Sequence, residues 1–133
     1  MTRTALLFAL LLSSLPAVAQ PSVEGTWFGF GQPEDKMAMW VEHFAPNGDF
    51  EVYHRSCIDI MASNERQQGR WTVSGDTLTT NVTEIQGRSR SVISTYKIET
   101  LDENSLSYRN AQNFLYTARR VAADFRMPSC RRR

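Results

Sequence analysis

Apolar and polar residues alternate in short runs from Gly25 to Val121, and turn-forming residues separate the runs. A period of two is typical of β-strands that bury one face. We predict strands at residues 25–31, 37–45, 49–56, 66–74, 77–85, 91–100, 105–110 and 113–121. Eight strands joined by short turns indicate an all-β, antiparallel up-and-down meander. Closing this meander into a barrel would leave no exposed sheet edge.

The turn between the second and third runs predicts how those strands pair. In Ala45-Pro46-Asn47-Gly48-Asp49, Pro46 suits the first central position of a type I turn and Gly48 tolerates a positive φ. This turn places Phe44 opposite Phe50, Glu42 opposite Val52, and Trp40 opposite His54. The two phenylalanines beside the turn favour their own face as the interior, and that face holds Ala38, Trp40, Glu42, Phe44, Phe50, Val52 and His54.

A second hairpin follows from Ser74-Gly75-Asp76-Thr77, which reads as a two-residue turn. It pairs Val73 with Leu78 and Trp71 with Thr80. The later strands add further inward candidates by alternation, namely Val92, Tyr96, Ile98, Leu106, Tyr108, Phe114 and Tyr116. A shift of one residue in register would move every one of these side chains to the outer face.

Residues 1–19 have the features of a secretory signal peptide. Arg3 precedes an apolar run at residues 5–12, and Pro16 precedes the small-residue cleavage sequence Ala17-Val18-Ala19. The apolar run is too short to span a bilayer, which needs about 20 residues. We therefore expect an exported protein, periplasmic or secreted, with no stable membrane insertion. The predicted organisation is a signal peptide at 1–19, a barrel domain at 20–121 and a basic C-terminal tail at 122–133.

Charge is distributed unevenly along the expected mature chain. Without Arg3, 14 basic residues face 14 acidic ones, so the formal net charge is zero. Residues 119–133 hold six arginines and one acid, which leaves the rest of the mature chain with an excess of five acids. A basic tail on an acidic body lacks the basic, aromatic-rich face of a nucleic-acid-binding protein, so no nucleic-acid partner is expected.

Two cysteines, Cys57 and Cys130, remain after the leader. An even number of cysteines in an oxidising compartment favours a disulfide, and the absence of a Cys-x-x-Cys pair disfavours redox-active thiols. The bond would tie the C-terminal tail to the body of the domain.

The order of these motifs resembles that of a lipocalin-like (calycin-type) small secreted bacterial β-barrel. Gly25-Thr26-Trp27 opens the first strand, and Phe44-x-x-x-Gly48-x-Phe50, Gly69-x-Trp71-x-Val73-x-Gly75-Asp76-x-Leu78, Tyr96-x-Ile98 and Arg119-Arg120-Val121 follow. The resemblance covers nearly the whole mature chain. It implies that Trp27 packs across the closed end beneath Arg119 or Arg120, in a cation–π contact of about 0.5–2 kcal/mol. It also implies a disulfide from the C-terminal segment to the barrel wall.

The opening strand is similar to that of nitrobindin-type haem barrels as well. That family places its haem-ligating histidine late in the chain, whereas the histidines here, His43 and His54, are both early. The histidine positions therefore argue against haem, and we expect no cofactor.

The predicted interior offers candidate binding residues. We expect Trp40, Glu42, Phe44, Val52, His54, Glu84 and Tyr96 to line a pocket, because a few polar groups in an apolar barrel are typical of a small-ligand site. Glu42 and His54 have two other interpretations. They could form an acid–base pair, or Glu42 could be solvated at the rim while His54 is simply hydrogen-bonded.

Two functions remain open at this point. The first is a non-catalytic monomer that holds a small apolar or amphiphilic molecule in the barrel. The second is a protein-binding or inhibitory barrel with a filled interior, which would act through the polar 58–68 segment, predicted as a loop, or through the basic tail. A fold alone does not distinguish them.

Overall fold

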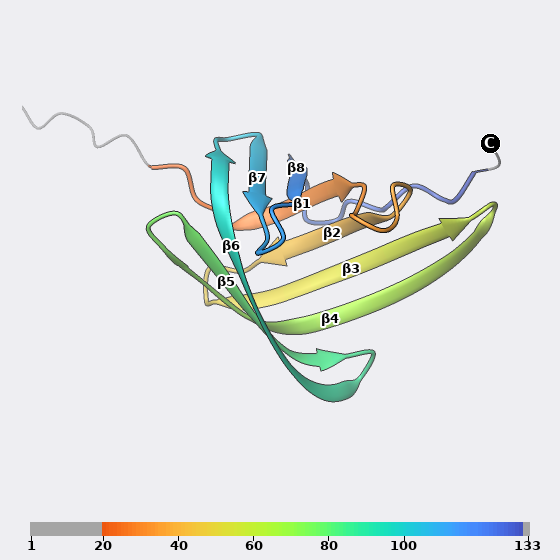
Figure 1. Ribbon diagram of the computed structural model, residues 1–133, viewed down its shortest axis with the longest axis horizontal. Helices are drawn as coiled ribbons and strands as arrows, with labels where there is room; N and C mark the ends of the chain where they lie inside the picture. The colour runs from red at the N-terminus through yellow and green to blue at the C-terminus, as the bar shows by residue number, and fades with distance from the viewer. Residues whose placement is uncertain (1–19, 132–133) are drawn as a thin grey trace, which may run out of the picture.

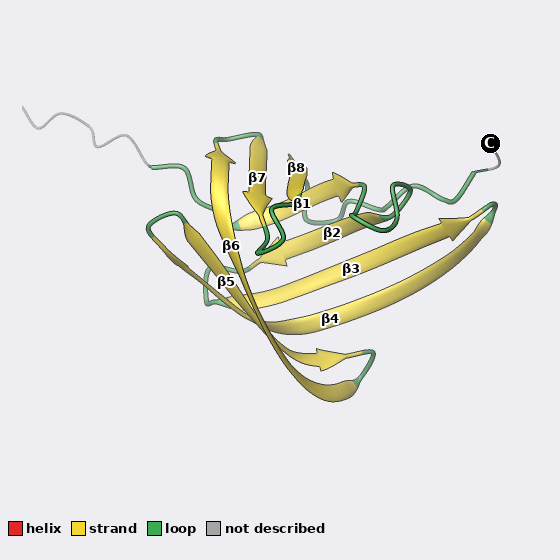
Figure 2. Cartoon of the chain, in the orientation of Figure 1, coloured by secondary structure: helices red, strands yellow, loops and turns green. Residues whose placement is uncertain are grey.

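The computed structural model describes residues 20–131, and the predicted all-β barrel is confirmed. Eight antiparallel strands each pair with the next along the chain, and the eighth pairs with the first (Figure 1). The described chain is drawn as strand and loop throughout (Figure 2). Among these residues there is no helix long and apolar enough to cross a membrane. The signal peptide predicted at 1–19 lies outside the described residues.

The strand bounds agree with the predicted ranges at most positions and differ in length at several. The strands are β1 (Gly25–Phe30), β2 (Met39–Phe44), β3 (Asp49–Ile58), β4 (Met61–Ser74), β5 (Thr77–Ile85), β6 (Arg88–Leu101), β7 (Ser105–Arg109) and β8 (Leu115–Val121).

The predicted register of the β2–β3 hairpin is confirmed. The structure pairs Phe44 with Phe50, Glu42 with Val52, and Trp40 with His54. In the turn, Gly48 adopts a φ of 90°, and Asn47 Oδ1 accepts a hydrogen bond from the Asp49 backbone N–H. The second hairpin also pairs as expected, with Val73 opposite Leu78 and Trp71 opposite Thr80. Local turn chemistry therefore determines which side chains of these strands point inward.

The prediction of a loop at residues 58–68 is wrong. This segment forms the tip of a long β3–β4 hairpin, and the ladder continues from Arg55 opposite Asn64 to Ile58 opposite Met61. The strands extend past the barrel wall (Figure 1), so solvent can reach both faces and the sequence there shows no apolar alternation. Backbone pairing, together with the hydrogen bond from Arg55 Nε to Asn64 Oδ1, maintains the strands instead.

One end of the barrel is filled by apolar side chains. Trp27 is fully buried there beside Phe44, Leu78 and Leu106. The Trp27 indole N–H donates to the carbonyl oxygen of Val23, so the segment before β1 closes this end.

The two arginines that the resemblance singles out have different positions. The Arg120 guanidinium lies 4.1 Å from the centre of the Trp27 ring and donates to the carbonyl oxygens of Ser22, Glu24 and Glu103. Arg119 points to the other face of β8, where it lies over the rings of Phe28 and Phe125. Arg120 alone therefore takes the place over Trp27.

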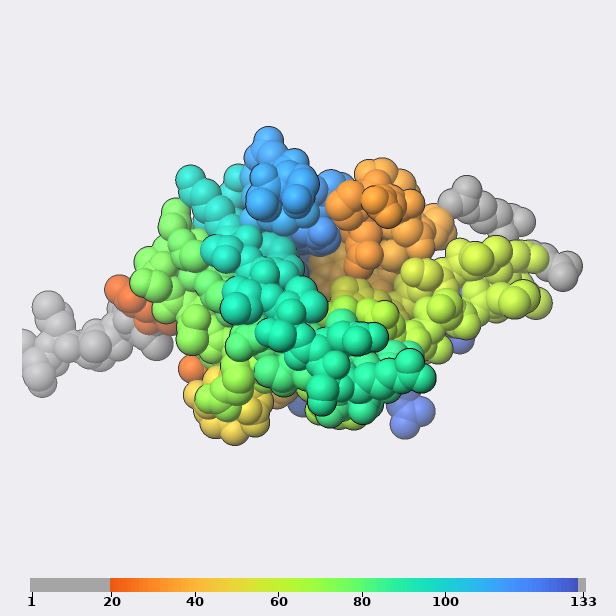
Figure 3. Space-filling model, turned by 60° about the horizontal axis from the view of Figure 1, so that its bottom comes forward, coloured from red at the N-terminus to blue at the C-terminus, as the bar shows by residue number. Residues whose placement is uncertain are grey.

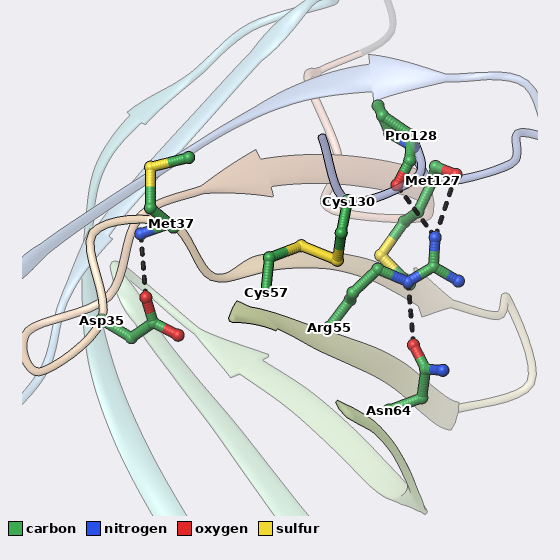
Figure 4. The surroundings of a disulfide bond; sticks show 8 residues. All are labelled: Asp35, Met37, Arg55, Cys57, Asn64, Met127, Pro128 and Cys130. Atoms are coloured by element: carbon green, nitrogen blue, oxygen red, sulfur yellow. Dashed lines mark hydrogen bonds between the residues drawn. A yellow bond between two sulfur atoms is a disulfide. The ribbon is translucent and has the colours of Figure 1, made fainter. Parts of the chain in front are cut away.

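The C-terminal tail crosses the outer face of β1–β3 and is bonded to β3 by a disulfide. Cys57 in β3 is bonded to Cys130, with a Cα–Cα distance of 5.5 Å (Figure 4). Arg55 donates hydrogen bonds to the carbonyl oxygens of Met127 and Pro128, as the same view shows. Further back, the Phe125 ring packs on Phe28 with centroids 4.9 Å apart. The predicted disulfide is thus present, and it is compatible with an oxidising, exported location.

Candidate ligand-binding pocket

The interior of the barrel is hollow at the end opposite Trp27. A cavity of about 290 Å³ lies between the strands there, and Figure 3 shows the hollow bordered by the orange 31–38 segment, teal β6 and the blue β7–β8 turn. Its wall is formed by Gln32, Trp40, Glu42, Phe50, Val52, His54, Gln67, Thr80, Val82, Val92, Ser94, Tyr96, Tyr108 and Tyr116. This volume is at the lower end of the range for small-molecule sites, so a ligand would have to be small.

Glu42 is the central polar group of this cavity. Its side chain is 4% exposed, and the Tyr108 hydroxyl lies 3.0 Å from both carboxyl oxygens, to which it can donate. Burial raises the pKa of Glu42 to about 7, although the Tyr108 hydroxyl and the neighbouring Trp40 indole act to lower it. The carboxyl therefore changes its charge close to neutral pH.

The surroundings of Tyr108 raise its pKa as well. Its hydroxyl is buried and faces the Glu42 carboxyl, and these two effects raise the pKa of Tyr108 well above its usual value. Tyr108 therefore stays protonated and can act as a hydrogen-bond donor throughout the physiological pH range. The Trp40 indole N–H, by contrast, makes no hydrogen bond of normal geometry to any described residue.

Four aromatic rings surround this polar centre. Tyr108 stacks on Tyr116 with ring centroids 5.4 Å apart, and Tyr96 meets Tyr108 edge-on at 4.9 Å. Trp40 approaches Tyr116 edge-on at 5.8 Å. The rings come from β2, β6, β7 and β8, so only closure of the barrel brings them together.

Two contacts define the mouth of the cavity. The Gln32 side-chain amide lies 3.0 Å from His54 Nδ1 and can donate to that nitrogen when the ring is neutral. Burial lowers the pKa of His54, with Glu65 acting in the opposite direction. At the rim, the Lys36 ammonium lies 5.2 Å from the centre of the Phe114 ring. The 31–38 segment is thereby joined to β3 and to the β7–β8 turn.

Five of the seven predicted site residues meet in the cavity wall, namely Trp40, Glu42, Val52, His54 and Tyr96. Phe44 and Glu84 do not line it. Phe44 is inward but packs below the cavity against Phe50 and Trp71. Alternation along β5 predicts Glu84 as inward, but a register shift between Val82 and Glu84 interrupts the alternation there.

Several wall residues are absent from the predicted site. Tyr108 and Tyr116 had been expected inside by alternation, but no local pattern shows that Tyr108 contacts Glu42, which is 66 positions away in the chain. Gln32 lies in an irregular connection between β1 and β2, where no periodicity predicts which way a side chain points. The inward alternation of β5 and β6 includes Thr80, Val82 and Ser94, so this pattern is sufficient to predict them as wall residues.

The fold and the cavity define a class: a closed, eight-stranded, antiparallel β-barrel with a pocket at one end, consistent with a lipocalin-like fold. Comparison with family models gives no match, and no curated protein is significantly similar to the chain. In the described part of the chain, no three His, Cys, Asp or Glu side chains are grouped as a metal site would require.

Proposed function

We propose that this protein is an exported, non-catalytic, lipocalin-like carrier that binds a small, partly apolar ligand inside the barrel. The observation that carries the proposal is the cavity of about 290 Å³ with the Glu42–Tyr108 pair in its wall. An apolar wall with a few convergent polar groups is the usual form of a small-ligand site, in which the polar groups orient the ligand. The proposed location is the periplasm or the extracellular space, which the disulfide and the N-terminal sequence support.

The hydrogen bonds of Glu42 and His54 support binding over catalysis. Glu42 is bonded to Tyr108, and His54 is bonded to Gln32. A general acid–base pair requires the acid and the base to act on one reacting group or on each other. Since each residue has a separate partner, we propose that they orient a ligand rather than transfer protons.

The first prediction concerns two neighbouring residues of β6 that point to opposite faces. Val92 lines the cavity, whereas Ile93 is 67% exposed. In native mass spectrometry of the protein purified from its own exporting cells, we expect a co-purifying small molecule. The Val92→Trp variant should lose it because the indole occupies the mouth, and Ile93→Trp should retain it.

A ligand that remains bound to Val92→Trp would place the binding site elsewhere and contradict the proposal. The proposal also fails if the native protein carries no ligand and no small aromatic compound binds to it in titrations. Circular dichroism of both variants checks that the barrel is intact.

The tip of the β3–β4 hairpin favours a second candidate, binding of a protein partner. Ile58, Ile60 and Met61 are 77%, 56% and 72% exposed, an apolar group on an otherwise polar extension. Exposed apolar patches of this kind mark interaction sites. The disulfide between Cys130 and Cys57 ties the basic tail to the same hairpin, on β3.

For this candidate we expect that a partner cross-linked to the wild-type protein is lost when Ile58, Ile60 and Met61 are replaced together by serine. The same triple variant should keep the small molecule of the barrel. Unchanged cross-linking would remove the hairpin tip from consideration.

A further inference from the structure

The described wall of the cavity holds one acidic side chain, Glu42, and no lysine or arginine, and the Lys36 ammonium lies outside it, at the rim over Phe114. His54 is kept neutral at neutral pH by its burial. The remaining polar wall groups are amides and hydroxyls, from Gln32, Gln67, Thr80 and Ser94, with the tyrosine hydroxyls. An anionic ligand inside the cavity would therefore meet a carboxylate and no counter-ion in the described wall.

The aromatic rings also favour a positively charged ligand. Tyr96, Tyr108, Tyr116 and Trp40 form a continuous set, with neighbouring centroids between 4.9 and 6.2 Å apart. The face of an aromatic ring is electronegative and attracts organic ammonium groups, most strongly where water is excluded. Several rings around one carboxylate give a cation both short-range contact and a counter-charge.

We propose that the ligand is a small organic ammonium ion with an apolar body, held by Glu42 as its counter-ion and by the surrounding aromatic rings. This inference rests on the proposed function, because it names the ligand class of the same cavity. The Tyr108 hydroxyl takes up only part of the acceptor capacity of the carboxylate, so the remaining lone pairs can accept N–H groups of the ligand. The apolar body lies along Phe50, Val52 and Val82.

Binding of this kind is coupled to the protonation of Glu42. The groups that face its carboxyl are Tyr108 from β7, Tyr96 from β6 and Trp40 from β2, and both tyrosines stay protonated at neutral pH. An ammonium ligand binds the carboxylate form, so affinity should rise with pH up to about pH 8. Below pH 7, binding should release a proton from Glu42.

The test compares three probes that share a 2-phenylethyl group and differ in its polar substituent: phenethylamine, 2-phenylethanol and 3-phenylpropionate. Calorimetric titration of the mature protein at pH 8 should show that the amine binds at least tenfold more tightly than the alcohol, and the acid more weakly than both. Glu42→Gln should lower the affinity for the amine to that for the alcohol. The affinity for the alcohol itself should change little.

Glu51→Gln is the matched control, since it removes the same charge from β3 at a residue paired with Arg66 and outside the cavity wall. It should leave the amine affinity within about twofold of wild type. A second variant, Tyr116→Leu, keeps an apolar wall but removes an aromatic face. It should weaken binding of the amine several-fold more than binding of the alcohol.

The outcomes separate this inference from the function on which it rests. Equal or tighter binding of the alcohol or the acid overturns the ammonium ligand but leaves a small-molecule pocket in place. An amine preference that persists in Glu42→Gln also overturns it. If none of the three probes binds, the inference fails, and the mass-spectrometry experiment on Val92→Trp then decides the proposed function independently.

Discussion

Removing the disulfide by replacing both Cys57 and Cys130 with serine is expected to lower the free energy of unfolding by about 2–4 kcal/mol. The bond joins residues 73 positions apart. In the chain-entropy model, cross-linking a loop of this size raises the free energy of the unfolded state by about 4–5 kcal/mol, which is an upper value. The lower value applies if the freed tail separates from the barrel in the native state and regains part of its conformational entropy.

Urea unfolding, followed by tryptophan fluorescence, measures this effect. The wild-type protein in the presence of a reductant should behave like the double serine variant, because both lack only the cross-link. Arg55→Gln serves as the control, since it removes the hydrogen bonds to Met127 and Pro128 but leaves the covalent bond. If the oxidised and reduced proteins unfold at the same urea concentration, the bond contributes nothing to the stability of the barrel.

The β2–β3 hairpin shows how far local sequence can predict this fold. Pro46 and Gly48 determine the type of turn, and the turn determines which residues pair along the two strands. The period-two pattern then assigns the faces. Strand order follows from the short turns, and the closed barrel follows because it leaves no edge unpaired. All of these signals act over a few residues, which is why the sequence is enough to predict them.

The hairpin tip at residues 58–68 shows where local signals fail. A strand that extends beyond the barrel has no buried face, so its composition resembles that of a loop although its backbone is fully paired. Glu84 illustrates a second failure. A single irregularity in the β5–β6 pairing interrupts the alternation, and no residue type at that position indicates that it is there.

The candidate site was predictable in its parts but not in its central contact. Glu42 and Tyr108 were each expected to point inward by alternation, yet their hydrogen bond joins β2 to β7 across the barrel. Such a contact depends on the diameter of the closed barrel and on the stagger of all its strands. Sequence patterns specify neither quantity directly. The effect of Tyr108 on the charge of Glu42 therefore required the three-dimensional structure.

Glu42→Gln is expected to stabilise the ligand-free protein at pH 8 by up to about 3 kcal/mol, the value that corresponds to the shift in pKa. The folded-state pKa of about 7 lies above the ordinary value of 4.5, so the folded protein holds this proton more tightly than the unfolded chain does. The resulting stability is complete below about pH 4.5 and is lost as the pH rises through 7. Glutamine keeps an oxygen that can accept from Tyr108 and never becomes charged.

Urea unfolding of wild type and Glu42→Gln at pH 5 and pH 8 tests this sign. The two proteins should have similar stability at pH 5, and the variant should be clearly more stable at pH 8. Glu51→Gln should not gain stability at pH 8. Although burial acts to raise the pKa of Glu51, hydrogen bonds from Arg66, Tyr53 and Gln68, together with the charge of Arg66, outweigh it and lower the pKa. Equal effects of Glu42→Gln at both pH values would show that the carboxyl is ionised at no cost, and Glu42 would then lie in a solvated site.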